Sequence, residues 1–330
     1  RTVGPGHPAY IIAEIGSNHD QDKGRALDMI RKAAACGVDA VKFQSLKFDE
    51  IYQPEHETAA FRDWFAAIQL PEEWYADLAS AAKDAGVDFL SAPCYPASVP
   101  LLEAVGVPAY KLGSPQVQGD SRVTRAAAAC GKPMIMSVGY CYEVDIQRAL
   151  DWCAAEGNYD TVLLHCVSKY PTNFSESNLA FMQTLAKTFD RPVGFSDHTP
   201  GGHLAVAAVA LGACVVEKHV TDDRARKGPD HNFALTFEEF ARMVREIREL
   251  EAAMGSSDFP NLLPDVLDLR RRYRYKAFAA RDLRAGEAIE VAAYRSEYFD
   301  DALGADQIAE GATAKTDIAK GQPIRAEDVQ

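Results

Sequence analysis

Two histidines lie at the ends of short apolar runs in this sequence. His198 follows the run 193–196 (VGFS), and His219 ends the run 214–219 (CVVEKH). Imidazoles at the ends of neighbouring strands can share a divalent metal ion whose remaining positions are filled by water or substrate. Each histidine could equally be a packed or capping residue, so the metal prediction depends on the charged residues around the pair.

Most of the other apolar runs also end in polar residues. Two lysines and three serines that converge on one rim of an otherwise acidic protein predict a phosphate or carboxylate site. A single serine or lysine at a strand end is more often a helix cap or a solvated group, so the prediction rests on the set. The candidates beside the two histidines are Glu14, Lys42, Gln44, Ser91, Lys111, Ser114, Gln116, Ser137, Ser168, Tyr170 and Ser196.

Asp230 lies in the loop 227–233 (KGPDHNF) that follows the last apolar run. From there it could bring a further carboxylate to the same rim. It could equally cap the helix that begins near Thr236 or brace the loop itself.

The elements that must position these residues repeat along the first 255 residues. Short apolar runs alternate with segments of helical period, which is typical of a parallel sheet built from strand–helix units. The runs are 10–14, 40–44, 88–92, 109–112, 133–137, 161–165, 193–196 and 214–219, and helices are predicted near 24–36, 74–85, 145–156, 179–187 and 237–254. Eight repeats fit a closed (β/α)8 TIM barrel, whose reactive groups gather at the C-terminal ends of the strands. The competing open, doubly wound sheet lacks its main signal, a GxGxxG after the first strand.

Composition and charge narrow the class of protein further. The net charge of −13 opposes binding to nucleic acid or to an anionic membrane, since both depend on clustered lysine and arginine. The chain has neither an apolar run of membrane-spanning length nor the layout of a signal peptide at its start, so a cytoplasmic protein is expected. Its seven scattered cysteines form no CxxC pair, and we expect most of them to be buried thiols.

A second, smaller unit is predicted after the barrel of residues 1–255. Residues 256–273 contain two prolines and no clear period, which indicates a linker. Residues 274–330 carry two similar phrases, ARDLRAGE and TDIAKGQ, each with a glycine turn, which predict two halves of a small β-rich domain. A unit of this size is marginal alone and is expected to dock on a barrel.

At this point the sequence resembles a known family, the N-acetylneuraminate (sialic acid) synthases, including those for legionaminic and pseudaminic acids. The matching phrases are IIAEIGSNHDQD, AVKFQSLK, FLSAP, YKLGS, MSVGY, LLHCVSKYPT, GFSDHT, VVEKHVT and GPDHNFAL. Nine ordered phrases across most of the barrel make the resemblance specific. The tail resembles, more loosely, the antifreeze-like (SAF) domain of that family.

The resemblance implies a transferase that condenses phosphoenolpyruvate with the aldehyde of an N-acetylhexosamine, giving a 3-deoxy-nonulosonic acid and phosphate. Lys42, Lys111, Ser114, Ser137, Ser168 and Ser196 look like the residues that bind phosphoenolpyruvate. His198 and His219 look like the ligands of Mn²⁺ or Mg²⁺. Glu14, Gln44, Tyr170 and Asp230 match positions that contact the sugar or assist proton transfer. Arg295 lies near the position from which the family's SAF domain reaches into the partner subunit's site, which implies a domain-swapped homodimer.

Several residues depart from the family's pattern, mostly on the sugar side. Ala92 replaces a threonine of the usual Ser-Thr-Pro phrase. Gln116 replaces a glutamate, and the neutral amide of glutamine cannot act as a base. Ser91 could compensate for Ala92 only if it faces inward. Segment 48–70 shows no obvious asparagine for an acyl-amino group, and Arg295 is followed by Ser-Glu-Tyr rather than Pro-Gly-x-Gly.

These departures leave two alternatives open. The first is a synthase that uses a 6-phosphorylated or atypical aldose, for which a basic cluster near the sugar would be the sign. The basic residues available for it are Lys169, Arg224, Arg226 and Lys227. The second alternative is a catalytically silent homologue that binds a sugar acid.

Overall fold

The computed structural model describes residues 1–255, 258 and 261–330. The chain divides into two compact units, Arg1–Gly255 and Ser256–Gln330. Of the predicted linker 256–273, residues 256, 257, 259 and 260 lie outside the described residues, whereas helix α12 occupies Pro264–Tyr273.

Eight parallel strands form the centre of the first unit, as the sequence predicts. They are β1 (Tyr10–Glu14), β2 (Ala40–Ser45), β3 (Asp88–Pro93), β4 (Tyr110–Leu112), β5 (Met134–Ser137), β6 (Thr161–His165), β7 (Val193–Asp197) and β8 (Val215–Thr221). Their order is β3-β2-β1-β8-β7-β6-β5-β4, and the two-residue strand β9 (Leu235–Thr236) pairs with β8. The result is a nearly closed TIM-type barrel, and the open doubly wound sheet is excluded.

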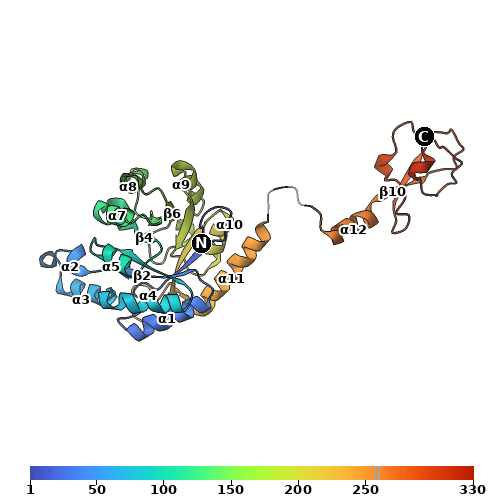
Figure 1. Ribbon diagram of the computed structural model, residues 1–330. Coiled ribbons are helices and arrows are strands. Elements are labelled where there is room, and N and C mark those ends of the chain that lie inside the picture. Colours follow the sequence, from blue (N-terminus) through green and yellow to red (C-terminus); the bar gives the residue numbers. More distant parts are fainter. Residues whose placement is uncertain (256–257, 259–260) are drawn as a thin grey trace. The chain divides into compact units, whose positions relative to one another are not determined.

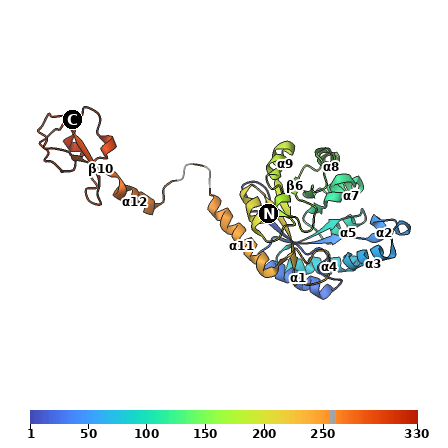
Figure 2. The ribbon, with the colours of Figure 1, turned by 180° about the vertical axis from the view of Figure 1, so that it is seen from behind.

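Helices surround these strands in both views of the molecule (Figures 1 and 2). They are α1 (Lys23–Ala35), α2 (Phe48–Ile51), α3 (Ala59–Ile68), α4 (Tyr75–Asp84), α5 (Ser98–Ala104), α6 (Ser114–Gly119), α7 (Ser121–Ala128), α8 (Glu143–Ala155), α9 (Phe181–Phe189), α10 (His203–Ala210) and α11 (Phe237–Met254). Helix α11 contacts both α1 and α10, so the ring of helices is continuous where the chain's first and last barrel helices meet.

The local sequence explains where the main helices begin. The Asp22 side chain accepts a hydrogen bond from the backbone N–H of Arg25 at the start of α1. Thr236 and Glu239 form a capping box at the start of α11. Both arrangements satisfy N–H groups that a helix leaves unpaired in its first turn.

Strand residues alternate between two apolar clusters. One cluster, which includes Ile12, Leu90 and Val215, contains no helix residue and fills the inside of the barrel. The other, which includes Ile11 and Val216, packs the outer face of the strands against the helices. Because side chains alternate along a strand, a residue's parity fixes the side on which it lies.

The second unit is small and mostly β. Strands β10 (Tyr275–Ala279) and β11 (Val291–Arg295) form an antiparallel pair. The two phrases that resemble each other in sequence meet here, since Leu283 and Ile318 exchange backbone hydrogen bonds of 2.9 and 2.8 Å and share one apolar cluster. Within the described residues, no helix combines the length and the apolar character that crossing a membrane requires.

Candidate functional site

A cavity of about 300 Å³ opens among the carboxyl ends of the barrel strands. It brings together all of the sequence-predicted site residues except Ser91, Asp230 and Arg295. Those that line it are Glu14, Lys42, Gln44, Lys111, Ser114, Gln116, Ser137, Ser168, Tyr170, Ser196, His198 and His219. Strand register accounts for part of this grouping, because Glu14 is paired with Lys42 on one side and with His219 on the other.

Four charged residues are buried together on one side of the cavity. Lys42 Nζ lies 2.8 Å from Glu14 Oε2 and 3.7 Å from Glu217 Oε2. Lys111 Nζ lies 3.4 Å from Glu217 Oε1. The four residues form what we call the charged quartet, which is nearly neutral as a whole.

Burial and ion pairing act against each other in the quartet. Burial opposes the charge of Lys42, but Glu14 and Glu217 outweigh it and raise the pKa of this lysine. Burial lowers the pKa of Lys111, which has a single carboxylate close by. For Glu217, burial is outweighed by Lys111 and Lys42, and its pKa lies well below the ordinary value. The carboxylate of Glu217 is therefore ionised at neutral pH.

Hydroxyl groups and a glycine surround the quartet. Ser196 donates a hydrogen bond of 3.1 Å to Glu217 Oε1, and the backbone N–H of Gly139 donates one of 2.9 Å to Ser114 Oγ. Ser137 Oγ is buried and makes no hydrogen bond with the described residues. A β-carbon at position 139 would lie only 2.4 Å from Ser168 Oγ, so the hydroxyls approach the backbone as closely as a glycine permits.

The two histidines lie side by side, with ring centres 5.6 Å apart. His198 Nδ1 lies 2.8 Å from the carbonyl oxygen of Val167, which can only accept, so Nδ1 carries the hydrogen and Nε2 keeps a lone pair. Burial and the neighbouring His219 lower the pKa of His198 to about 3, so this imidazole is neutral at ordinary pH. His219 Nδ1 is buried and has no hydrogen-bond partner among the described residues.

Asp230 lies beside this pair, although it does not line the cavity itself. Its Oδ2 is 3.7 Å from His219 Nδ1 and accepts a hydrogen bond of 3.1 Å from Ser17 Oγ. Gly16 has a φ of +54°, and a β-carbon there would lie 2.8 Å from the same oxygen. Asp230 is thus packed against the turn that follows β1.

The outer wall of the cavity is apolar and comes from the segment after β2. Leu46, Ile51, Tyr52 and Phe65 line it. The Phe65 ring packs against Phe48 and Tyr52 at centroid distances of 5.4 and 5.5 Å. Tyr170 lines the cavity from the loop after β6, with its ring centre 4.2 Å from that of His198.

The four basic residues considered for a phosphorylated sugar lie elsewhere. Lys169 pairs with Glu176 at 2.6 Å, and Arg224 pairs with Glu239. Arg226 pairs with Asp222 at 3.1 Å, and Lys227 is exposed. None of the four is among the residues that line the cavity.

Ser91 requires a correction. Its hydroxyl lies 2.8 Å from Ser45 Oγ, on the face of β3 opposite to the cavity. The physical reason is strand alternation, because Leu90 belongs to the inner cluster and Ala92 lines the cavity, which leaves Ser91 facing outward. Ser91 therefore does not replace the hydroxyl that Ala92 lacks.

Arg295 belongs to β11 in the second unit, so its prediction stays open. It is exposed, with its guanidinium 5.4 Å from the ring centre of Tyr275. The positive charge of an arginine in this position is attracted to the face of the tyrosine ring.

The sequence reasoning missed several residues of the cavity, above all Glu217. A signal for it was present, because Glu217 and His219 have the same parity on β8 and must share a face. The apolar wall had no comparable signal, since it comes from irregular segments. The other cavity residues missed were Cys94, Gly113, Pro115, Tyr140, Cys166, Leu46, Ile51, Tyr52 and Phe65.

Known proteins resemble this chain over most of its length. Residues 29–259 match the model of the NeuB family, and residues 277–330 match that of the SAF domain. The N,N'-diacetyllegionaminic acid synthase of Legionella pneumophila is 34% identical over 295 residues, which cover 85% of this chain and 82% of that protein. The N-acetylneuraminate-9-phosphate synthase of Mus musculus is 34% identical over 302 residues, covering 88% and 83%. Among solved structures, the N-acetylneuraminic acid (sialic acid) synthetase of Leptospira borgpetersenii is 28% identical with a TM-score of 0.75, and the match covers 82% of this chain and 93% of that one.

Proposed function

The chain belongs to the NeuB family, and on that premise we propose that it joins phosphoenolpyruvate to the open-chain aldehyde of an unphosphorylated amino sugar. The products are a 3-deoxy-ulosonic acid of the sialic acid type and inorganic phosphate. The observation that carries the proposal is the buried charged quartet, which shares one cavity with two histidines.

We assign the phosphate and carboxylate of phosphoenolpyruvate to Lys42 and Lys111. Both lysines are already buried, so an anion that binds them does not have to remove them from water. When the anion binds, its own ion pairs with the two lysines replace part of their pairing with Glu14 and Glu217. The hydroxyl of Ser137, which lacks a partner among the described residues, is available to orient the ligand.

The bond changes follow from the chemistry of an enol phosphate. C3 of phosphoenolpyruvate attacks the aldehyde carbon, water adds to C2, and the C2–O bond breaks as phosphate leaves. We assign Glu14 as the base that accepts the proton of this water, because its carboxylate is fixed between Lys42 Nζ at 2.8 Å and Gln44 Nε2 at 2.7 Å. Gln116 lines the same cavity and contributes an uncharged amide.

The donor groups fit a divalent metal held by His198 and His219. Both imidazoles line the cavity, and each has a ring nitrogen without a hydrogen bond to the described residues. Two imidazoles favour Mn²⁺ over Mg²⁺, which prefers oxygen ligands. When bound, such an ion would polarise the aldehyde carbonyl and add positive charge to a nearly neutral quartet. Within the described residues no third His, Cys, Asp or Glu completes a three-ligand group, so we expect weak binding that a chelator reverses.

The apolar wall of the cavity supports an unphosphorylated acceptor. Leu46, Ile51, Tyr52 and Phe65 offer contact for methyl and acyl groups, and a phosphate placed against them would lose its hydration without gaining a cation. The relatives' names include both kinds of product, an acid without phosphate and a 9-phosphate. The pairing of Lys169, Arg224 and Arg226 with carboxylates argues against the second kind here.

Phosphate release from phosphoenolpyruvate tests this proposal. The full chain is assayed with Mn²⁺ against a panel of N-acetylated hexosamines, diacetamido hexoses and their 6-phosphates, and products are identified by mass. We expect release only with an unphosphorylated aldose, loss of release with EDTA, and recovery with Mn²⁺. Turnover with 6-phosphates alone would refute the acceptor assignment, and no turnover with any aldose would refute the synthase and favour the silent homologue.

A pair of histidine variants tests the metal assignment. His219→Ala is expected to lose the metal-dependent rate and to bind Mn²⁺ more weakly in a direct titration. His203→Ala is the matched control, because His203 is exposed at the start of α10, where its ring contacts that of Phe174 outside the cavity lining. An unchanged rate in His219→Ala would remove the metal from this position.

A further inference from the structure

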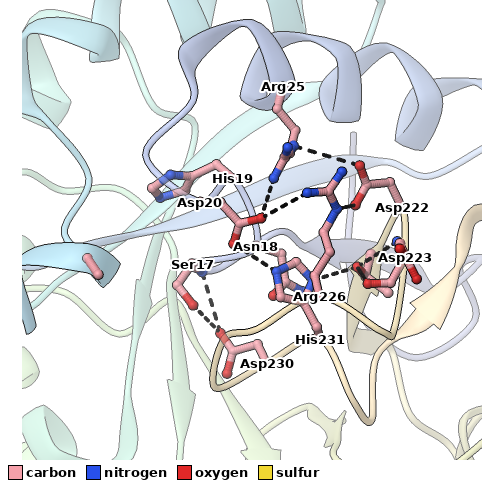
Figure 3. Close-up of polar contacts among 12 residues, drawn as sticks. Ser17, Asn18, His19, Asp20, Arg25, Asp222, Asp223, Arg226, Asp230 and His231 are labelled. Atoms are coloured by element: carbon pink, nitrogen blue, oxygen red, sulfur yellow. Dashed lines mark hydrogen bonds and ion pairs between the residues drawn. The ribbon is translucent and has the colours of Figure 1, made fainter. Parts of the chain in front are cut away.

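A second set of polar contacts joins the turn after β1 to the loop after β8 (Figure 3). We propose that Asp20 and His231 form a positioning pair that fixes the neighbouring Asp230 against the cavity. The inference rests on the proposed function and on the sequence-based expectation that Asp230 contacts the sugar or assists proton transfer. Neither Asp20 nor His231 lines the cavity, so each would act through Asp230 and not on substrate.

His231 is the buried residue that holds the loop after β8 in place. Most residues from Asp223 to Pro229 are exposed, whereas the imidazole of His231 is fully buried. Its Nε2 lies 2.9 Å from Asp20 Oδ1, and its Nδ1 lies 2.7 Å from Thr221 Oγ1. A β-carbon at Gly228 would lie 2.8 Å from the ring, so the loop is folded tightly over it.

The chemistry of the pair fixes its direction. A carboxylate oxygen only accepts hydrogen bonds, so His231 Nε2 carries the hydrogen and donates it to Asp20. This bond joins two segments that are 211 residues apart in the chain. A hydrogen bond to a carboxylate is stronger than a neutral one, and this partly buried bond holds both segments.

Asp20 itself is held in an unusual conformation. Asp20 and Gln21 have φ values of +49° and +55°, in the left-handed region that side chains rarely adopt. Such a turn persists only where the surroundings stabilise it. Here Arg25 pairs with Asp20 Oδ2, and Arg226 lies 3.6 Å from the same oxygen.

Asp222 is a second acidic residue that pairs with the two arginines beside Asp20. Its carboxylate lies 3.1 Å from Arg226 Nε and 3.8 Å from Arg25 Nε, so both arginines are shared between the two acidic residues (Figure 3). The arrangement ties the loop after β8 to the first turn of α1. Salt bridges at the surface are weak singly, but the buried His231 makes this network cooperative.

The consequence falls on Asp230. It precedes His231 directly and can move little while the His231 ring stays buried. On its other side Asp230 accepts from the hydroxyl and, at 3.4 Å, the backbone N–H of Ser17. With both sides fixed, its Oδ2 stays 3.7 Å from His219 Nδ1.

Hydrogen exchange tests the holding role without any turnover. In the full chain, Asp20→Ala is expected to lower the protection of backbone amides in residues 222–234 by roughly tenfold or more. Asp20→Asn should restore most of it, because an amide oxygen still accepts from Nε2–H. The control is Asp28→Ala on α1, whose carboxylate pairs with Lys32 near the surface. Unchanged protection in Asp20→Ala would overturn the pair, even if the synthase proposal had already failed.

A double-mutant cycle tests whether the pair acts through Asp230. We expect Asp20→Ala to lower kcat by about tenfold or more and to leave KM for phosphoenolpyruvate nearly unchanged. In the background of Asp230→Ala, Asp20→Ala should lower kcat by less than twofold, because the carboxylate that the pair positions is absent. If the kcat losses of the two single variants simply multiply in the double variant, Asp20 has a general structural role and the proposal is overturned.

Discussion

Gly139 shows at the level of a single residue how closely the cavity is built. The position has ordinary backbone angles, so conformational freedom does not require a glycine there. The limited space around the position requires the glycine, because a β-carbon would lie 2.4 Å from Ser168 Oγ, 2.7 Å from Cys166 Sγ and 3.2 Å from Ser114 Oγ. Three side chains therefore converge on one backbone position between β5 and α8.

Replacing Gly139 by alanine should therefore damage phosphoenolpyruvate binding more than folding. We expect kcat/KM for phosphoenolpyruvate to fall on the order of 100-fold, about 2.7 kcal/mol of transition-state stabilisation, while the unfolding temperature changes little. Phosphate-release kinetics measure the effect. Gly119→Ala is the matched control, because a β-carbon at Gly119 meets nothing within 4 Å. Equal kinetics in the two variants would mean that the Ser168 side of the cavity does not bind substrate.

Much of the site could be predicted because it lies on regular strands. Glu14, Lys42 and Lys111 are polar residues in apolar runs, and a parallel barrel brings the ends of such runs together. Ser91 was misplaced because its parity was not compared with that of Leu90 and Ala92. Applied to β8, the same comparison would have added Glu217.

The turn after β1 has several residues in the left-handed region of backbone conformation. It contains Gly16, Asp20 and Gln21 at positive φ, and it packs His19 into a fully buried position. The His19 ring lies edge to face with that of Trp74, with ring centres 5.7 Å apart, and its Nδ1 accepts a hydrogen bond from the backbone N–H of Gln21. Burial lowers the pKa of His19 to about 4, so the imidazole stays neutral.

This buried histidine should make the barrel less stable in mild acid. Between pH 6.5 and about 4 the unfolded chain binds a proton at His19 and the folded chain does not, so stability falls as the pH falls. At pH 5 the loss is roughly 2 kcal/mol. His19→Asn keeps an acceptor for Gln21 and should lose this part of the pH dependence.

Urea unfolding at pH 7 and pH 5 measures the difference. All three tryptophans, Trp64, Trp74 and Trp152, lie in the first unit, so their fluorescence follows the barrel. His203→Asn, at an exposed position, should keep the full pH dependence. The same slope in His19→Asn as in the unchanged protein would contradict a neutral, buried His19.

Elements outside the regular repeat were the hardest to predict. The apolar wall comes from Leu46, α2, α3 and the loop that joins the two helices, where several aromatic rings pack on one another. No period of 2 or 3.6 residues marks such a cluster, because its members meet through tertiary packing. Helix α12 was also missed, although Val266, Leu269 and Tyr273 follow a helical spacing, because all ten of its residues are exposed and the segment begins with a proline.

At the scale of the whole molecule, the prediction that remains is a domain-swapped homodimer. The second unit presents Arg295 on β11, exposed beside Tyr273 and Tyr275. We expect this arginine to reach the cavity of a partner subunit, where it would add the positive charge that the neutral quartet lacks.

Mixing two inactive variants tests this arrangement. His219→Ala impairs the barrel site and Arg295→Ala impairs the tail, so each homodimer should be nearly inactive. In a swapped heterodimer one site has an intact barrel and an intact tail, and activity should return to a substantial fraction of one normal site. If each tail serves its own barrel, every site of the mixture keeps a defect and activity does not return.

The central claim is that water attacks C2 of phosphoenolpyruvate and that the C2–O bond breaks during condensation with a sugar aldehyde. Phosphoenolpyruvate labelled with ¹⁸O at the bridging oxygen tests it directly, by mass analysis of the released phosphate. We predict that the label appears in phosphate, in an amount equal to the sugar acid formed, and only when an aldose is present. Unlabelled phosphate, or phosphate released without an aldose, would contradict the account.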